Sequence, residues 1–127
     1  MAKKEFLFKG KSLEEIEKIG LNEFSLLLPA RQRRSIKRGF TEAQKRLLEK
    51  MKKGKDNIET HCRNMIIIPD MIGKTIKVHD GKNFVNVAIA MDMLGHCLGE
   101  FVQTRKKISH SAPGVGATRS SAAISVK

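Results

Sequence analysis

Arginine and lysine form the clusters in this sequence whose chemistry is clearest, because both side chains bind phosphate. Five of the eight residues from Arg31 to Arg38 are basic, and a second cluster spans Arg105 to Lys107. The planar guanidinium group of arginine can bind a phosphate through two parallel hydrogen bonds and can stack on a base. Helical spacing would place Arg31, Arg34 and Arg38 on one face. We therefore predict a nucleic-acid partner rather than an inert, solvated surface.

The overall charge supports the same prediction. The 127-residue chain carries a formal net charge of +12 at pH 7. Repulsion among these positive charges opposes compaction unless a polyanion is near. Nucleic acid is the leading candidate, because lysine and arginine gain affinity when they displace condensed counterions from its phosphates. We find no helix-turn-helix signal, no zinc-finger spacing and no aromatic stacking platform. Contacts to RNA shape and backbone should therefore dominate over base readout.

Histidine and cysteine suggest a metal site that we do not predict. His61-Cys62 and His96-Cys97 form two pairs, and His79 and His110 are isolated. Neighbouring residues point to different sides of a helix or strand and rarely bind one ion. We therefore expect two reduced cysteines, no metal and no cofactor. A zinc-dependent nuclease is the disfavoured alternative.

Catalysis is not predicted either, because no nucleophile, base and orienting group occur together. Most carboxylates lie in the N-terminal helices, where capping and ion pairing account for them. Glu100 is expected to be architectural, accepting backbone hydrogen bonds or pairing with Arg105. The run Gly114 to Arg119 resembles a phosphate loop only superficially, since it lacks the lysine and the flanking strand and helix.

Four helices are predicted before residue 58. Ser12 and Thr41 each begin a capping box, with Glu15 and Gln44 as the reciprocal partners. The four predicted helices are residues 13–19 ended by Gly20, 22–28 capped by Asn22, 29–38 opened by Pro29 and ended by Gly39, and a helix following Thr41 with Leu47, Leu48 and Met51 as its apolar stripe. Favourable i,i+4 pairs are expected between Glu42 and Arg46 and between Glu49 and Lys53.

Strands are predicted in the next segment. Residues 65–68 should form a buried strand stopped by Pro69, and residues 75–79 a second. Asp80-Gly81 is typical of a two-residue hairpin, which would pair residue 79 with 82, 78 with 83, 77 with 84 and 76 with 85. This places Ile76, Val78, Val85, Val87 and Ile89 on one face, with Lys77, His79, Lys82 and Asn86 on the other. Asp92 should cap a short helix ended by Gly99.

The predicted elements give a helical N-terminal extension, a β-rich core and an extended C-terminal tail. We expect three regions: a basic helical region over 1–58, an α+β RNA-binding core over 59–112 and a tail over 113–127. The tail is rich in Ser, Ala and Gly, so a partner should be needed to order it. No signal peptide or membrane-spanning stretch is recognised, and a soluble, intracellular protein is expected.

The order of motifs resembles one known family. Residues 81–104, which end in Leu98-Gly99-Glu100-Phe101-Val102-Gln103-Thr104, are similar to the recurring motif of the universal small-subunit ribosomal protein S-nineteen, called S-fifteen in eukaryotes. Ala30 to Arg34, Arg38-Gly39 and Pro113 to Ser121 resemble the archaeal and eukaryotic branch. The short segment before residue 60 is similar to archaeal members.

The resemblance implies an α+β fold, a small mixed β-sheet with packed helices, a helical N-terminal extension and an extended C-terminal tail. It places the protein in the cytoplasm, bound to the ribosome, in the head of the small subunit on the 3′ major domain of its rRNA. It also implies contacts with protein S-thirteen, with a bridge element of the large subunit, and with tRNA or mRNA near the tail, but none with a membrane. The implied rRNA-binding residues are Arg31, Arg33, Arg34, Lys37, Arg38, Lys74, Lys82, Arg105, Lys106, Lys107 and His110, and the decoding-side residues are Gly114, Gly116, Thr118 and Arg119. A free-standing basic nucleic-acid-binding protein is the alternative.

Overall fold

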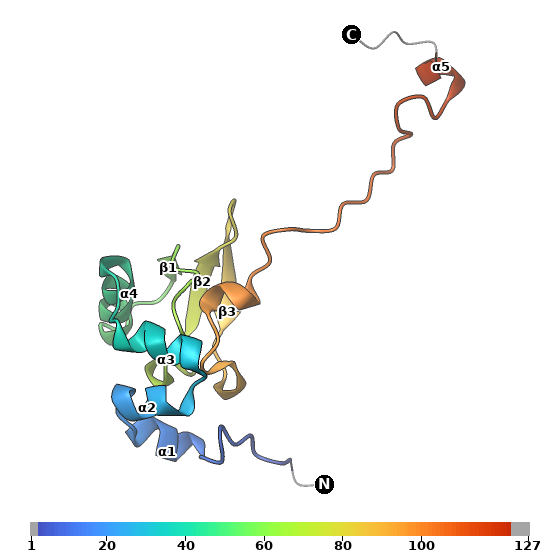
Figure 1. The fold of residues 1–127 in the computed structure, drawn as a ribbon. Coiled ribbons are helices and arrows are strands. Elements are labelled where there is room, and N and C mark those ends of the chain that lie inside the picture. Colours follow the sequence, from blue (N-terminus) through green and yellow to red (C-terminus); the bar gives the residue numbers. More distant parts are fainter. Residues whose placement is uncertain (1–2, 123–127) are drawn as a thin grey trace.

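The computed structural model describes residues 3–122 and confirms the α+β class. Four helices precede a three-stranded sheet, and an extended tail follows it (Figure 1). The helices are α1 (Leu13–Lys18), α2 (Leu21–Leu27), α3 (Ala30–Lys37) and α4 (Glu42–Lys52). The strands are β1 (Ile58–Thr60), β2 (Thr75–His79) and β3 (Phe84–Ala88). Short 3-10 helices are η1 (Pro69–Met71), η2 (Met91–Met93) and η3 (Leu98–Phe101), and α5 (Arg119–Ala122) lies in the tail.

Local capping explains where the N-terminal helices begin. Both predicted capping boxes are present, with Ser12 and Thr41 accepting hydrogen bonds from the backbone of Glu15 and Gln44. The predicted cap at Asn22 is wrong, because Gly20 is the N-cap and Asn22 lies inside α2. There the Asn22 carbonyl accepts a 2.6 Å hydrogen bond from Ser25 Oγ.

The sheet is mixed, as predicted, but one of its strands is not the predicted one. Its order is β1-β2-β3, with β1 parallel to β2 and β2 antiparallel to β3. The predicted strand over 65–68 is wrong, although those residues are buried. Their backbone pairs with the irregular segment 95–98, for example Ile67 N to His96 O at 2.8 Å, and Ile66 forms only an isolated bridge to Cys97. The third strand is instead β1, which sequence analysis did not identify.

The hairpin between β2 and β3 has a longer loop than predicted. The structure pairs His79 with Phe84, Val78 with Val85 and Ile76 with Val87, so the predicted register is wrong by two residues. The cause is Asp80, whose carboxylate accepts hydrogen bonds from the backbone N–H groups of Lys82 at 2.8 Å and Asn83 at 2.6 Å. These bonds stabilise a four-residue loop. A shift of two residues keeps every side chain on its predicted face.

The segment after β3 also differs from the prediction. A helix capped by Asp92 and ended by Gly99 is not formed; η2 and η3 take its place, and Gly99 lies within η3. Gly95 separates them with φ +82°, a conformation that side chains disfavour. A Cβ at Gly95 would also lie 2.6 Å from Leu28 Cδ2. The chain therefore turns tightly at this point against the end of α2.

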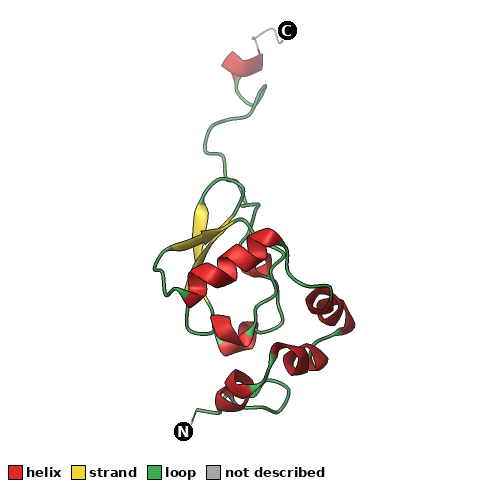
Figure 2. Ribbon diagram, turned by 90° about the vertical axis from the view of Figure 1, so that its left-hand side faces the viewer, coloured by secondary structure: helices red, strands yellow, loops and turns green. Residues whose placement is uncertain are grey.

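One hydrophobic core joins the N-terminal helices to the sheet. Its fully buried side chains include Ile16 and Phe24 from α1 and α2 and Ile76 and Val78 from β2. Helix α4 crosses one face of the sheet (Figure 2). Its Leu47 and Met51 are buried in the same cluster as these strand residues. The opposite sheet face carries Lys77, His79, Phe84 and Asn86; Phe84 and Asn86 are exposed, and Lys77 and His79 are half-buried.

Beyond residue 102 the described chain runs away from this body (Figures 1 and 2). Residues 103–120 are all exposed. The last five residues of the predicted tail, 123–127, lie outside the described residues. Within the described part of the chain, no helix has the length and apolar character needed to cross a bilayer.

Candidate nucleic-acid interface

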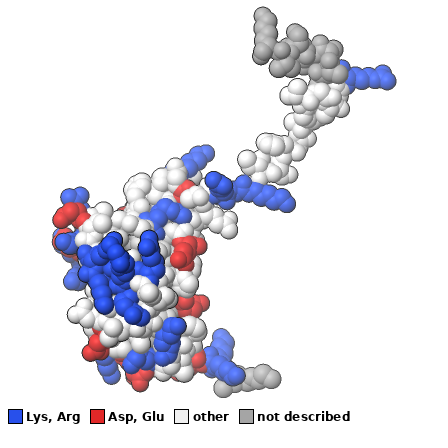
Figure 3. Space-filling view, in the orientation of Figure 1, with Lys and Arg blue, Asp and Glu red and all other residues white. Residues whose placement is uncertain are grey.

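The most concentrated positive charge on the body lies on α3. Its side chains Arg31, Arg34, Lys37 and Arg38 are exposed, and we call these four residues the α3 patch. Figure 3 shows the corresponding group of basic side chains over the position of α3. A shallow hollow of about 430 Å³ is lined by Ala30, Arg33, Arg34, Lys37 and Arg38. A concave basic surface of this kind suits an RNA backbone.

The sequence of α3 explains why its basic side chains face outward. Ile36 is the only residue of the helix with a buried side chain, at 7 % exposure. This single apolar anchor turns the opposite faces of the helix to solvent. The helix then stops at Gly39, whose φ of +87° ends the turn.

Arg33 differs from its neighbours because it points inward. Its side chain is half-buried, and Nη2 donates a 3.1 Å hydrogen bond to the carbonyl of Leu28 at the end of α2. Its Nε is buried and has no hydrogen-bond partner among residues 3–122. The structure therefore places Arg33 at the junction of α2 and α3, where it fixes the helix that carries the α3 patch.

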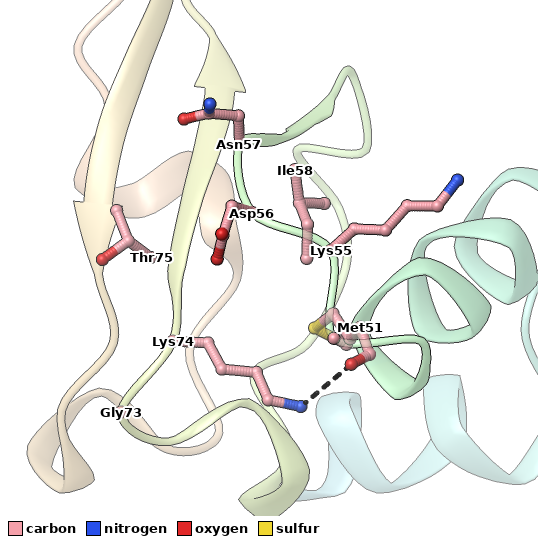
Figure 4. A pocket seen from close by; sticks show the side chains of 9 residues that line it. Met51, Lys55, Asp56, Asn57, Ile58, Gly73, Lys74 and Thr75 are labelled. Carbon is pink, nitrogen blue, oxygen red and sulfur yellow. Dashed lines mark hydrogen bonds between the residues drawn. The ribbon is translucent and has the colours of Figure 1, made fainter.

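Lys74 is likewise directed into the protein. Its Nζ lies 3.5 Å from the carbonyl of Met51, at the C-terminal end of α4 (Figure 4). The dipole of a helix favours a cation at that end. A cavity of about 440 Å³ opens beside this contact, with Asp56 and Thr75 among its lining residues. Lys74 thus interacts with the helix end rather than standing free on the surface.

A second basic group lies at the hairpin and the start of the tail. Lys82 is exposed in the hairpin loop, and Arg105, Lys106 and Lys107 are exposed where the tail leaves the body. Hydrogen bonds from the backbones of Asn83 and Lys82 lower the pKa of Asp80, and the charge of Lys106 lowers it further. Lys106 therefore lies within electrostatic reach of Asp80 in the hairpin loop.

The remaining predicted site residues lie along the tail. His110, Gly114, Gly116, Thr118 and Arg119 are exposed. Gly116 has φ +79°, and Thr118 Oγ1 lies 3.1 Å from Ser120 Oγ at the start of α5. The structure does not bring these residues to either basic group on the body.

No carboxylate forms a salt bridge with these cations within residues 3–122. There the only basic side chain within salt-bridge distance of a carboxylate is His96, whose Nδ1 lies 2.6 Å from Glu100 Oε2. The expected pairs Glu42–Arg46 and Glu49–Lys53 are therefore wrong, and Glu100 pairs with His96 rather than with Arg105. The exposed arginines and lysines are left to interact with an external anion.

Arg63 is a functional side chain that sequence analysis missed. Its guanidinium donates to three backbone carbonyls, those of His79 at 2.7 Å, Gly99 at 2.8 Å and Val102 at 2.6 Å. Gly99 permits this approach, because a Cβ there would lie 2.9 Å from Arg63 Cβ. Arg63 ties the end of β2 to η3 and to the start of the tail. No local sequence signal distinguishes it from a surface arginine.

The histidines and cysteines are not arranged as a metal centre. In residues 3–122, no three His, Cys, Asp or Glu side chains are placed to hold a metal ion. Cys62 and Cys97 are both free thiols. Burial raises the pKa of Cys97, and the nearby negative charge of Glu100 raises it further. A raised pKa favours the protonated thiol of Cys97 over the thiolate, which is the reactive form.

Comparisons with known proteins agree with this geometry. Residues 34–110 match the family described as ribosomal protein S19. The chain is also 46 % identical over 125 residues to the small ribosomal subunit protein uS19 of the archaeon Methanococcoides burtonii, covering 98 % of this chain and 91 % of the relative. Together the match and the archaeal relative show that this chain belongs to the ribosomal protein S19 family, as an rRNA-binding protein of the small ribosomal subunit.

Proposed function

We propose that the chain is a structural component of the head of the small subunit, bound to the 3′ major domain of its rRNA and without catalysis of its own. The single observation that carries this proposal is the uncompensated α3 patch. Four exposed cations lie on one short helix, and none of them has a carboxylate partner in the described part of the chain. Family membership also places the chain in the cytoplasm, bound to the ribosome.

The proposed mechanism is electrostatic. Each phosphate that the protein neutralises releases condensed counterions, which makes the affinity depend on salt with a log–log slope of about −0.9 per contact on duplex and −0.7 on single strands. The core carries the α3 patch and the hairpin loop with Lys82, and Arg105–Lys107 follow where the tail leaves the body. Two separated basic surfaces suit a position where rRNA helices converge.

The finer assignments form part of the same proposal. We divide the chain into a helical region over 1–58, an rRNA-binding core over 59–112 and a decoding-side tail over 113–127. The proposed partners are protein S-thirteen, a bridge element of the large subunit, and tRNA or mRNA near the tail. Gly114, Gly116, Thr118 and Arg119 are the decoding-side candidates, and His110 is a further rRNA-binding candidate. Their exposure on the described tail supports these roles.

Binding to small-subunit rRNA at graded salt concentrations tests the proposal. We expect the triple variant Arg31→Gln/Arg34→Gln/Arg38→Gln to bind more weakly and to flatten the log–log slope by about 2–2.7, the loss of three phosphate contacts. The matched control is Lys45→Gln/Lys50→Gln/Lys52→Gln, which removes the same charge from α4. An unchanged slope in the arginine variant, or an equal change in both variants, would contradict the assignment of α3.

Sedimentation distinguishes the ribosomal role from that of a free-standing basic protein. The native protein should migrate with small subunits, and duplex DNA should compete poorly with small-subunit rRNA. A stable pool outside ribosomes that binds DNA and RNA equally well would favour the free-standing alternative.

A further inference from the structure

Three aromatic side chains occupy neighbouring positions on one face of the sheet: His61 just after β1, His79 at the end of β2 and Phe84 at the start of β3. The parallel register pairs Thr60 with Val78, so the next residue of each segment, His61 and His79, lie side by side. His79 is in turn paired with Phe84 of β3. Because side chains alternate along a strand, these rings lie on the face opposite Ile76 and Val78, which are buried in the core. We call His61, His79 and Phe84 the ring row.

The rings contact one another closely. The ring centroids of His61 and His79 are 4.3 Å apart with an interplanar angle of 36°. Phe84 meets both rings edge-on, at 5.3 Å from His61 and 4.9 Å from His79. Offset and edge-to-face arrangements of this kind are the preferred geometries of aromatic pairs. The three centroid distances are similar, so the rings converge into one compact cluster rather than standing as three independent side chains.

Hydrogen bonds hold both the ring and the backbone of His79 in place. Nδ1 of His79 accepts a 3.1 Å hydrogen bond from the backbone N–H of Gly81. The carbonyl of His79 accepts the 2.7 Å bond from Arg63. A surface that is already ordered loses little further conformational entropy when a ligand binds.

The ring row is open to solvent and surrounded by polar groups. His61 is exposed, Phe84 is 37 % exposed, and His79 is half-buried. Lys77 and Asn86 form the neighbouring pair on the same face, and Lys82 is exposed in the adjoining loop. A protein-docking surface would have more apolar residues around its aromatic centre. Aromatic rings flanked by cations instead match the surfaces that bind single-stranded nucleic acid.

We propose that the ring row is a stacking platform for an unpaired nucleobase of the small-subunit rRNA, with Lys82 and Lys77 near the adjoining phosphates. This inference rests on the proposed function, because it takes the rRNA as the ligand. It adds a contact of a different kind. A base stacked on the rings is bound mainly through its π face, whereas the α3 patch binds phosphate charge.

The test uses the full chain bound to a small-subunit rRNA transcript. Ultraviolet irradiation of the complex should cross-link the RNA to His61, His79 or Phe84, as located by mass spectrometry of the peptides. His61→Ala and Phe84→Leu should each weaken rRNA affinity by about 5- to 150-fold, the range expected for losing one stacked base. The salt slope should stay unchanged, because no ionic contact is removed. Phe6→Leu is the matched control, since Phe6 is 52 % exposed and lies outside the ring row.

The outcomes separate this inference from the proposed function. Loss of salt-dependent rRNA binding by the unmodified chain would overturn the proposed function. Normal binding, with both ring-row variants equal to Phe6→Leu and no cross-link at the rings, would overturn the platform alone. Unchanged rRNA affinity combined with lost incorporation of a neighbouring protein into reconstituted subunits would assign the rings to a protein contact and also overturn it. Circular dichroism checks folding, and His61→Ala alters an exposed side chain outside the core.

Discussion

Arginine has two different roles in this chain, and burial separates them. Arg31, Arg34 and Arg38 extend into solvent, whereas Arg63 turns inward and donates to three backbone carbonyls, one at the end of β2 and two at η3 and its C-cap. A planar guanidinium can direct its N–H groups at several acceptors at once, which a lysine ammonium cannot do in the same geometry. Residue type alone therefore does not identify the residues that contact RNA.

Replacing Arg63 should destabilise the protein. We expect Arg63→Lys to lower the free energy of unfolding by about 2 kcal/mol or more, because hydrogen bonds to a charged group contribute about 1.5–3 kcal/mol each and at least one would be lost. Urea unfolding measures the change. The control Arg34→Lys lies on the exposed α3 patch and should change stability by no more than about 0.5 kcal/mol. Equal stabilities of the two variants would show that the hydrogen bonds of Arg63 do not stabilise the fold.

Asp80 makes the hairpin sensitive to acid. Its folded-state pKa is lowered from the ordinary value of 3.8, mainly by the hydrogen bonds from Asn83 and Lys82. A lowered pKa means that the ionised carboxylate stabilises the fold fully above that ordinary value and loses this effect as the pH falls below it. The melting temperature should therefore exceed that of Asp80→Asn near neutral pH, and the difference should shrink below pH 3.8. The control Asp92→Asn, whose carboxylate accepts no hydrogen bond within residues 3–122, should show no such convergence.

At the scale of elements, capping determines where α4 begins and therefore how it covers the sheet. Thr41 accepts from the backbone of Gln44, and the Gln44 side chain accepts from the backbone of Thr41 at 3.0 Å. Thr41→Ala should cost about 1 kcal/mol of unfolding free energy, with a range of about 0.5–2 kcal/mol. Thr41→Ser keeps the hydroxyl and should remain near the original stability. If both substitutions have the same effect, the hydroxyl does not carry the cap.

Sequence reasoning identified the elements that are stabilised locally. The capping boxes at Ser12 and Thr41 and the alternation in β2 and β3 are all short-range signals, and the structure confirms them. Sequence reasoning missed the features that depend on contacts between segments distant in the chain. Residues 65–68 look like a strand but pair with 95–98, and the ring row exists only because the β1–β2 register sets His61 beside His79.

In the candidate interface, too, the features set by local sequence could be predicted and those set by distant segments could not. The α3 patch could be predicted because helical spacing alone gathers its charges on one side. The inward placement of Arg33 and Lys74 could not, because each one depends on a carbonyl supplied by another helix. The proximity of Lys106 to the hairpin loop likewise depends on the path of the chain after η3.

At the scale of the whole molecule, charge repulsion is not offset by internal pairing. The net charge is +12, and no Lys or Arg forms an ion pair with a carboxylate in residues 3–122. Moderate salt screens repulsion between exposed charges and has few attractive pairs to weaken. The melting temperature of the free protein should therefore rise with added NaCl, as measured by calorimetry. A neutral osmolyte at equal osmolality is the control, and a melting temperature that falls with NaCl would contradict this account.

The tail gives this small protein a long reach. Residues 103–118 leave the body in an extended path, and sixteen residues can span at most about 50–60 Å. A compact body of about 100 residues has a radius of gyration of only about 13 Å. The tip can therefore arrive at a location well beyond the footprint of the anchored core. Shortening the tail from residue 113 onward would reduce the distance at which the protein acts and would keep its attachment, because the α3 patch and Arg105–Lys107 lie before that point.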